Sequence, residues 1–155
     1  MGINDAELAA NPILHARVLQ DLNEQPRIPA EKVGAVDAAT CVVSIDYLTA
    51  PVAVLASLRE RMVKGGRVHL VVSNRCFPTK AVQRWLRSSD EEKLEMVGDY
   101  LWFAGWREVE IVTLNDGGGS GGGWFGFGRT DPLWVVRGTN TGDGIERGGH
   151  AHSEL

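Results

Sequence analysis

The sequence predicts an α/β fold built around a parallel pair of strands. Residues 40–45 and 68–73 are short, unbroken runs of small, apolar and β-branched side chains, which is typical of strands buried on both faces. Between them, residues 51–64 place apolar side chains at helical spacing, and Gly65 and Gly66 follow as a helix stop. A strand, a helix and a strand with short connections form a βαβ unit, so these two strands should be parallel.

The rest of the chain supplies shorter elements. Asn4 and Glu7 resemble a capping box and predict a short helix through Ala10. Ser89 is followed by three acidic residues, which favour the first turn of a helix that ends near Gly105. We also expect a short strand at 17–20, a helix at 80–87, and two further strands at 109–114 and 132–137.

Composition indicates one globular domain and excludes several classes of function. The chain has 155 residues, of which 43% are hydrophobic and 23% charged, with a formal net charge of −4. A protein that holds nucleic acid through its phosphates needs a basic surface, so no nucleic-acid partner is expected. No apolar run approaches the roughly 18 residues of a membrane span, and the N-terminus lacks the pattern of a secretory signal. With only two cysteines, the chain fits a cytoplasmic protein.

Glycine dominates two segments that show no helix or strand pattern. Residues 117–128 are interpreted as a glycine-rich insertion rather than a phosphate-binding loop, because no Gly-Lys-Ser or Gly-Lys-Thr follows the glycines. Residues 138–155 contain almost no apolar side chains and are predicted to be a disordered tail. His150 and His152 lie in that tail, so no metal site is expected from them. Cys76 next to a basic residue could be an activated thiol, but a packed loop cysteine is the stronger interpretation.

Two acidic residues stand directly after predicted strands. Asp21 follows residues 17–20 and Asp46 follows residues 40–45. Open α/β sheets bind ligands outside the carboxyl ends of their strands, where a carboxylate can accept hydrogen bonds from a ribose or an adenine amino group. Aspartate also caps turns, and position alone does not separate the two roles.

Four segments follow one another along the chain, at residues 20–23, 40–48, 64–66 and 73–80. In sequence and in order they resemble the motifs of a class I S-adenosylmethionine-dependent methyltransferase of the type 11 kind. The resemblance extends over about residues 3–137. It implies an incomplete Rossmann-like methyltransferase sheet, mostly parallel with a C-terminal antiparallel hairpin, in a partial methyltransferase domain at 1–137. S-adenosyl-L-methionine is the implied cofactor.

The resemblance also implies positions for the site. Cofactor contacts would come from Asp21 and Leu22 after one strand, and from Ser44, Ile45 and Tyr47 after the next. The substrate would approach Asn74, Arg75 and Phe77, which follow residues 68–73. No catalytic base is assigned, because placement of the two reactants can suffice for methyl transfer.

The sequence departs from this family at its beginning. The family starts with a strand that ends in an acidic, glycine-rich turn, and no such segment precedes Asn4. We therefore expect the first βαβ unit to be absent, the segment around Val18 to have no neighbour, and the strand around Val43 to show an open, apolar edge.

Two functions follow from the resemblance and from this departure. The first is methyl transfer from S-adenosylmethionine to an unknown small-molecule acceptor, with impaired activity in the isolated chain. The alternative is a non-catalytic, truncated methyltransferase-like protein that pairs with another chain through the open sheet edge. A redox function of Cys76 is a third, weaker hypothesis.

Overall fold

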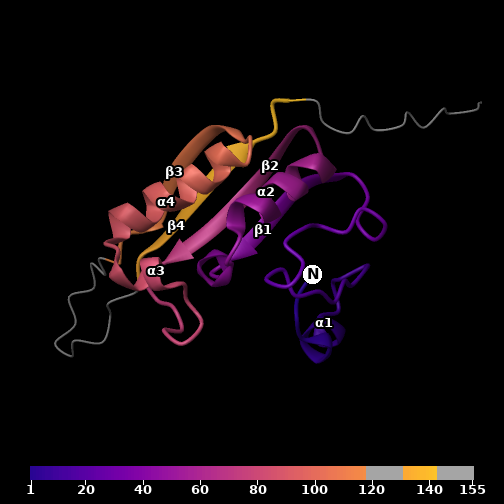
Figure 1. Ribbon diagram of the computed structural model, residues 1–155, viewed down its shortest axis with the longest axis horizontal. Coiled ribbons are helices and arrows are strands. Elements are labelled where there is room, and N and C mark those ends of the chain that lie inside the picture. The colour runs from indigo at the N-terminus through magenta and orange to yellow at the C-terminus, as the bar shows by residue number, and fades with distance from the viewer. Residues whose placement is uncertain (118–130, 143–155) are drawn as a thin grey trace, which may run out of the picture.

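Residues 1–117 and 131–142 are described by the computed structural model, and they form a mixed α/β fold around a four-stranded sheet (Figure 1). Along the chain the strands are β1 (Val36–Val42), β2 (Met62–Ser73), β3 (Arg107–Asn115) and β4 (Leu133–Thr139), and their order across the sheet is β1-β2-β4-β3. β1 and β2 are parallel, whereas β4 is antiparallel to both of its neighbours. The βαβ unit and the final antiparallel hairpin are therefore found. The prediction of a mostly parallel sheet is not confirmed, because one of the three described strand pairs is parallel and the other two are antiparallel.

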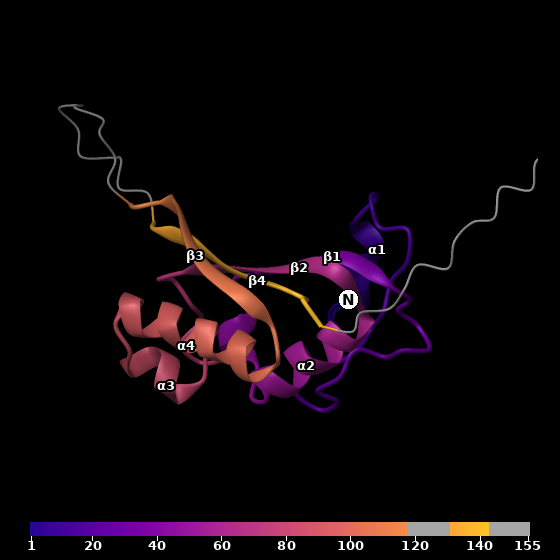
Figure 2. The ribbon, with the colours of Figure 1, turned by 90° about the horizontal axis from the view of Figure 1, so that it is seen from above.

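Three helices cover one face of this sheet (Figure 2). They are α2 (Pro51–Arg61), α3 (Gln83–Arg87) and α4 (Asp90–Phe103), and α4 begins with a complete capping box in which Ser89 and Glu92 bond each other's backbone. Trp106 is fully buried beneath them, and its indole Nε1 donates a hydrogen bond to the Leu55 carbonyl oxygen at 3.1 Å. No described helix is long and apolar enough to cross a membrane.

The junction between α2 and β2 differs from the sequence prediction. The helix ends at Arg61, and β2 begins at once with Met62, so the two glycines lie inside the strand. Gly65 has a φ of +80°, and a Cβ on Gly66 would lie 2.9 Å from the Asp37 carbonyl oxygen. The pairing of β1 with β2 shifts register over this stretch. These glycines therefore serve an irregular strand segment where two backbones approach closely, not a helix stop.

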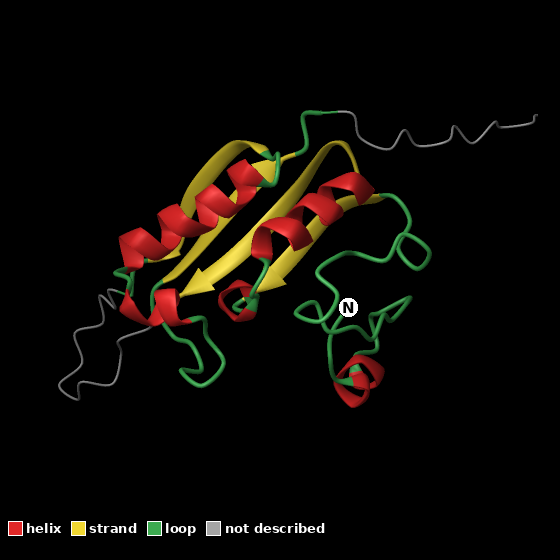
Figure 3. Ribbon diagram, in the orientation of Figure 1, coloured by secondary structure: helices red, strands yellow, loops and turns green. Residues whose placement is uncertain are grey.

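The N-terminal segment lies beside the edge formed by β1 and carries the short helix α1 (Asp5–Ala10) (Figure 3). The Asn4 side chain caps this helix by accepting hydrogen bonds from the Ala6 and Glu7 amides. Contrary to expectation, the segment around Val18 does have a neighbour. Gly2 forms a parallel bridge with Leu19: the Gly2 amide donates to the Val18 carbonyl at 3.1 Å, and the Gln20 amide donates to the Gly2 carbonyl at 3.0 Å.

The described structure continues into residues 138–142, the beginning of the segment that the sequence predicts to be a disordered tail. β4 continues to Thr139, and Asn140 is fully buried. The Asn140 backbone bonds both glycines of β2, since Gly65 N–H donates to its carbonyl at 2.8 Å and its own N–H donates to the Gly66 carbonyl at 2.9 Å. Residues 143–155 of the predicted tail, and nearly all of the predicted glycine-rich insertion, lie outside the described residues.

Candidate functional site

Loops that follow three extended segments meet at the carboxyl end of β1 and β2. Asn23, in the first loop, joins it to the second by three hydrogen bonds. Its Nδ2 donates to the Tyr47 carbonyl oxygen at 3.0 Å, and its Oδ1 accepts from the Thr49 amide at 2.8 Å and the Thr49 hydroxyl at 3.1 Å. This contact fixes the loop that holds Asp21 against the turn η1 (Ile45–Tyr47) that follows β1.

Tyr47 joins the third loop to the same cluster. The Phe77 amide donates to the Tyr47 hydroxyl oxygen at 3.2 Å, and the two ring centroids lie 6.5 Å apart. The Phe77 side chain is 66% exposed, and the ammonium group of Lys80 lies 5.6 Å from its ring centroid. The site therefore presents an exposed aromatic ring beside a half-buried one, which suits a flat, partly apolar ligand.

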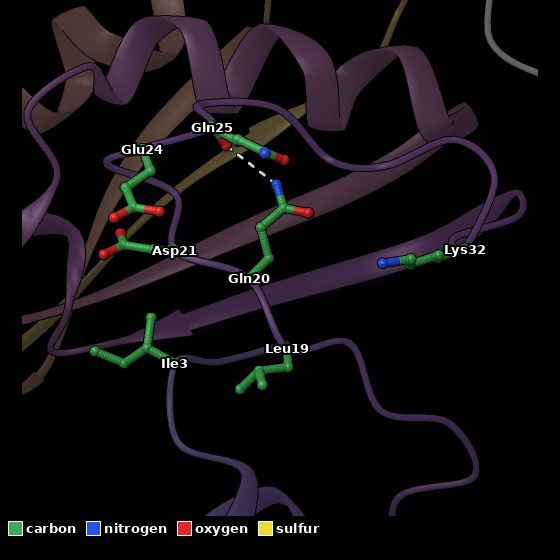
Figure 4. A pocket seen from close by; sticks show the side chains of 7 residues that line it. All are labelled: Ile3, Leu19, Gln20, Asp21, Glu24, Gln25 and Lys32. Carbon is green, nitrogen blue, oxygen red and sulfur yellow. Dashed lines mark hydrogen bonds between the residues drawn. The ribbon is translucent and has the colours of Figure 1, made fainter.

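An open hollow of about 610 Å³ adjoins the first loop (Figure 4). Asp21 and Glu24 lie together at one end of it and Lys32 lies at the other. The Asp21 Oδ1 atom also accepts a hydrogen bond from the Asn23 amide at 2.8 Å, so this residue caps a turn and lines the hollow at once. The two roles that the sequence left open for Asp21 are thus compatible. The hollow is lined by Ile3, Leu19, Gln20, Asp21, Glu24, Gln25 and Lys32.

The other predicted cofactor residues differ in how far a ligand could reach them. Ser44 is exposed, and its hydroxyl donates to the Val42 carbonyl at 2.7 Å. Leu22 is half-buried. The Ile45 side chain is only 2% exposed and belongs to the hydrophobic core, where it packs between the sheet and the helices. Of the residues predicted in this group, Asp21 and Tyr47 are the two that Asn23 brings together.

Of the predicted substrate residues, Asn74 and Arg75 are both exposed, in the same loop as Phe77. The Arg75 Nε atom lies 2.7 Å from the Asp131 Oδ2 atom, which comes from the segment before β4. Both side chains are well exposed, so this ion pair contributes little to stability. The pair brings the Arg75 guanidinium next to the segment that precedes β4.

Asp46 is the one buried acid of this region. It is 4% exposed, and its Oδ2 atom has no hydrogen-bond partner among the described residues. Burial raises the pKa of this carboxyl above its ordinary value, and a hydrogen bond from its own amide offsets only part of that effect. Asp46 is therefore no turn cap and no exposed ligand in this conformation. Its backbone carbonyl anchors the third loop by accepting from the Val82 amide at 3.0 Å.

The two cysteines are free thiols. Burial, together with the nearby Asp46 charge, raises the pKa of the Cys41 thiol to about 11. The neutral thiol thus dominates at physiological pH, and Cys41 has the character of a core residue rather than a nucleophile. Cys76 is half-buried and packs against the hydrophobic core, as the packed-loop interpretation expects.

Backbone strain is present where β1 enters the site. Val43 has a φ of +42°, which is rare for a β-branched residue, although its amide still bonds the Val71 carbonyl at 2.9 Å. Replacing Val43 with glycine is expected to raise the free energy of unfolding by about 1 kcal/mol, because glycine adopts this conformation without strain. Chemical denaturation measures the change.

Val42→Gly is the matched control for Val43→Gly. Val42 is also exposed and adjacent, but it does not have a positive φ, so glycine there should lower stability by about 1 kcal/mol. Equal losses from both substitutions would contradict strain at Val43.

Sequence reasoning missed the residue that assembles the site. Asn23 lies in the motif at residues 20–23, where no local pattern assigns it a binding role, although asparagine after a strand is a frequent turn residue. Its partners lie 24 and 26 positions away, so its bridging contact has no local signature in the sequence. Nowhere in residues 1–117 or 131–142 do three or more His, Cys, Asp or Glu side chains gather in a way that could hold a metal ion.

Comparisons with known proteins give one distant structural likeness. No known protein family matches this chain, and no curated protein does. Among solved structures, the crystal structure of the S-adenosylmethionine-dependent methyltransferase SibL in its apo form is similar, with a TM-score of 0.46 and 14% sequence identity. The likeness covers 79% of this chain and 34% of that protein, so the chain spans about a third of its length.

Proposed function

We propose that this chain contributes to S-adenosylmethionine-dependent methyl transfer to a small-molecule acceptor, and that it holds the adenosine side of the cofactor. The observation that carries the proposal is the Asn23 contact, which joins the Asp21 loop to the Tyr47 turn at the carboxyl end of a parallel strand pair. That end of an open α/β sheet is where nucleotide-like ligands bind. The ordered motif series that resembles class I methyltransferases supports the same function.

The residues present suit the chemistry of this cofactor. Asp21 and Glu24 offer carboxylate oxygens that can accept hydrogen bonds from ribose hydroxyls or an adenine amino group, and their charge favours a cationic ligand. Tyr47 and Phe77 offer aromatic surface for a flat ring. When bound, the cofactor would supply the methyl group on its positively charged sulfur, and the chain would contribute placement and exclusion of water.

On the acceptor side, Arg75 and Asn74 would orient the substrate. A guanidinium binds carboxylate and phosphate groups in a planar, bidentate manner, so Arg75 favours an acceptor that carries an acidic group. The amide of Asn74 can both donate and accept. Neither residue is proposed as a proton acceptor.

Binding by the isolated chain should be weak. The hollow is wide and open to solvent, and the Ile45 side chain is in the core rather than on its wall. We expect a dissociation constant above about 100 μM, which corresponds to less than about 5.5 kcal/mol of binding free energy.

Ligand-detected NMR titration with S-adenosylmethionine tests the proposal, because it measures dissociation constants into the millimolar range. Asp21→Asn keeps the oxygen that accepts from the Asn23 amide while removing the charge, so it should weaken binding about three-fold or more with an unchanged melting temperature. Asp99→Asn is the same change on the exposed surface of α4 and should leave binding unaltered. Equal affinities for the parent chain and Asp21→Asn would contradict the assignment of Asp21.

A second candidate function is pairing with another polypeptide through β1. The observation that favours it is the exposure of apolar side chains at this edge, since Val42 is 56% and Val43 is 41% exposed. β1 has β2 as its one neighbour in the described sheet. An edge strand of this kind offers unpaired backbone groups to another chain.

A further inference from the structure

The outer edge of β1 presents a regular row of backbone groups. The Val43 amide bonds the Val71 carbonyl, and Val42 is the residue in register with Val71. Backbone groups alternate in direction along a strand, so the odd-numbered residues face β2, and Ala38, Thr40 and Val42 direct their N–H and C=O groups outward. Within residues 1–117 and 131–142, these outward groups form one hydrogen bond, in which the Ser44 hydroxyl donates to the Val42 carbonyl oxygen.

The N-terminal segment beside this edge carries apolar and charged groups in a definite order. Figures 1 and 2 both place the N-terminal segment beside β1, and Ile3 and Leu19 on that segment are 73% and 53% exposed. Both side chains line the hollow described above. In Figure 4, Lys32 lies toward the beginning of β1, while Asp21 and Glu24 lie toward its end. The hollow is therefore acidic at the carboxyl end of β1 and basic at the other.

We propose that this edge binds an extended segment of another protein as an added β-strand, with a basic residue at the end that lies beside Asp21 and Glu24. The proposal rests on the second candidate function and specifies its partner. Outward N–H and C=O groups at strand spacing are satisfied by the backbone of another strand, which is the mode of β-augmentation. The exposed Val42, Ile3 and Leu19 favour apolar side chains in the bound segment, and the two carboxylates favour its basic end.

Fluorescence anisotropy with a labelled peptide tests this inference on the full chain. The probe is a short peptide of alternating threonine and valine that ends in two lysines, and we expect a dissociation constant of about 100 μM or tighter. A second probe carries proline at two of the threonine positions. Because proline has no amide donor, this probe should bind at least ten-fold more weakly. Equal binding of the two probes would overturn the proposal.

Two variants of the chain locate the binding edge. Thr40→Pro removes an outward N–H and leaves the hydrogen bonds to β2 in place. Edge strands tolerate proline at such positions, because the missing N–H had no partner within the sheet. Val42→Lys keeps the backbone but places a charge on the edge, a device that blocks strand addition. Loss of peptide binding in either variant, with an unchanged circular dichroism spectrum, supports the proposal, whereas unchanged binding in Val42→Lys overturns it.

The charge assignment and the alternative occupant are tested separately. Glu24→Lys should weaken binding of the lysine-ended probe several-fold and strengthen binding of a glutamate-ended probe. No change in the binding of either probe would contradict the predicted polarity.

Sedimentation tests the alternative occupant. If the chain dimerises through this edge and does not bind the peptide, the partner is a second copy of the chain and the proposal is overturned. None of these measurements involves S-adenosylmethionine. A negative result with the peptides therefore leaves the methyl-transfer proposal intact, and a negative cofactor titration leaves the peptide-binding proposal intact.

Discussion

Replacing Asn140 with alanine is expected to lower the free energy of unfolding by about 3 kcal/mol, because its buried side chain satisfies buried backbone groups. The Asn140 Nδ2 atom donates to the Met62 carbonyl oxygen at 3.1 Å, and its Oδ1 accepts from the Arg59 guanidinium at 3.3 Å. The same guanidinium donates from Nε to the Ala104 carbonyl at 3.3 Å. Asn140 thus ties the end of β4 to the end of α2 and to the junction that begins β2.

Urea denaturation of the purified chain measures the effect of Asn140→Ala. For a domain of this size the loss corresponds to a fall in melting temperature of about 6–12 °C. Asn74→Ala is the control, since Asn74 is exposed and should change stability by less than about 0.5 kcal/mol. If Asn140→Ala is as stable as this control, residue 140 does not belong to the core of the fold.

Replacing Asp46 with asparagine is expected to act in the opposite direction and to stabilise the chain at pH 7, because it removes a buried charge. The carboxyl is buried with an unpartnered oxygen, and burial raises its pKa in the folded chain above the ordinary value of 3.8. An acid with a raised folded-state pKa favours folding below its unfolded-state pKa and loses that contribution as the pH rises through the folded-state value. At neutral pH the ionised group therefore opposes folding, and the neutral amide removes the cost of the buried charge.

The pH dependence distinguishes this effect from a simple change in packing. The difference in stability between Asp46→Asn and the parent chain should be largest near pH 7 and should shrink toward zero as the pH falls to about 4. Thermal unfolding across this range measures it, with Asp99→Asn as a matched change on an exposed helix. A difference that is constant with pH, or that grows in acid, would contradict a raised pKa at Asp46.

Local sequence signals predicted the central elements well. The βαβ unit and the start of α4 were predicted because each is encoded by neighbouring residues: an apolar run, helical spacing, or acidic residues in a first helical turn. The Gly2–Leu19 bridge and the burial of Asn140 were not predicted, since both depend on partners far along the chain. Asn140 stands in a polar, glycine-rich stretch, where composition alone favours a tail.

The candidate site was only partly accessible to the same reasoning. Strand ends can be located from the sequence, and this placed Asp21, Tyr47 and Phe77 at one end of the sheet, where the structure joins them through Asn23 and the Tyr47 hydroxyl. Near a turn, however, the position of a strand end in the sequence does not tell which of the following side chains point into the core. Ile45 and Asp46 lie in the turn η1, which begins shortly after the end of β1, and both are buried although consecutive residues of a strand would point to opposite faces.

The central claim is that the loops around Asp21, Tyr47 and Phe77 form one surface that contacts S-adenosylmethionine. Its most direct test is a ¹H–¹⁵N correlation spectrum of the labelled chain, titrated with the cofactor to millimolar concentration. The account predicts that amide shifts move together in residues 20–25, 44–49 and 74–77, with one common dissociation constant, while those of α4 stay fixed. Shifts confined to other parts of the chain, or an unchanged spectrum at saturating cofactor, would contradict it.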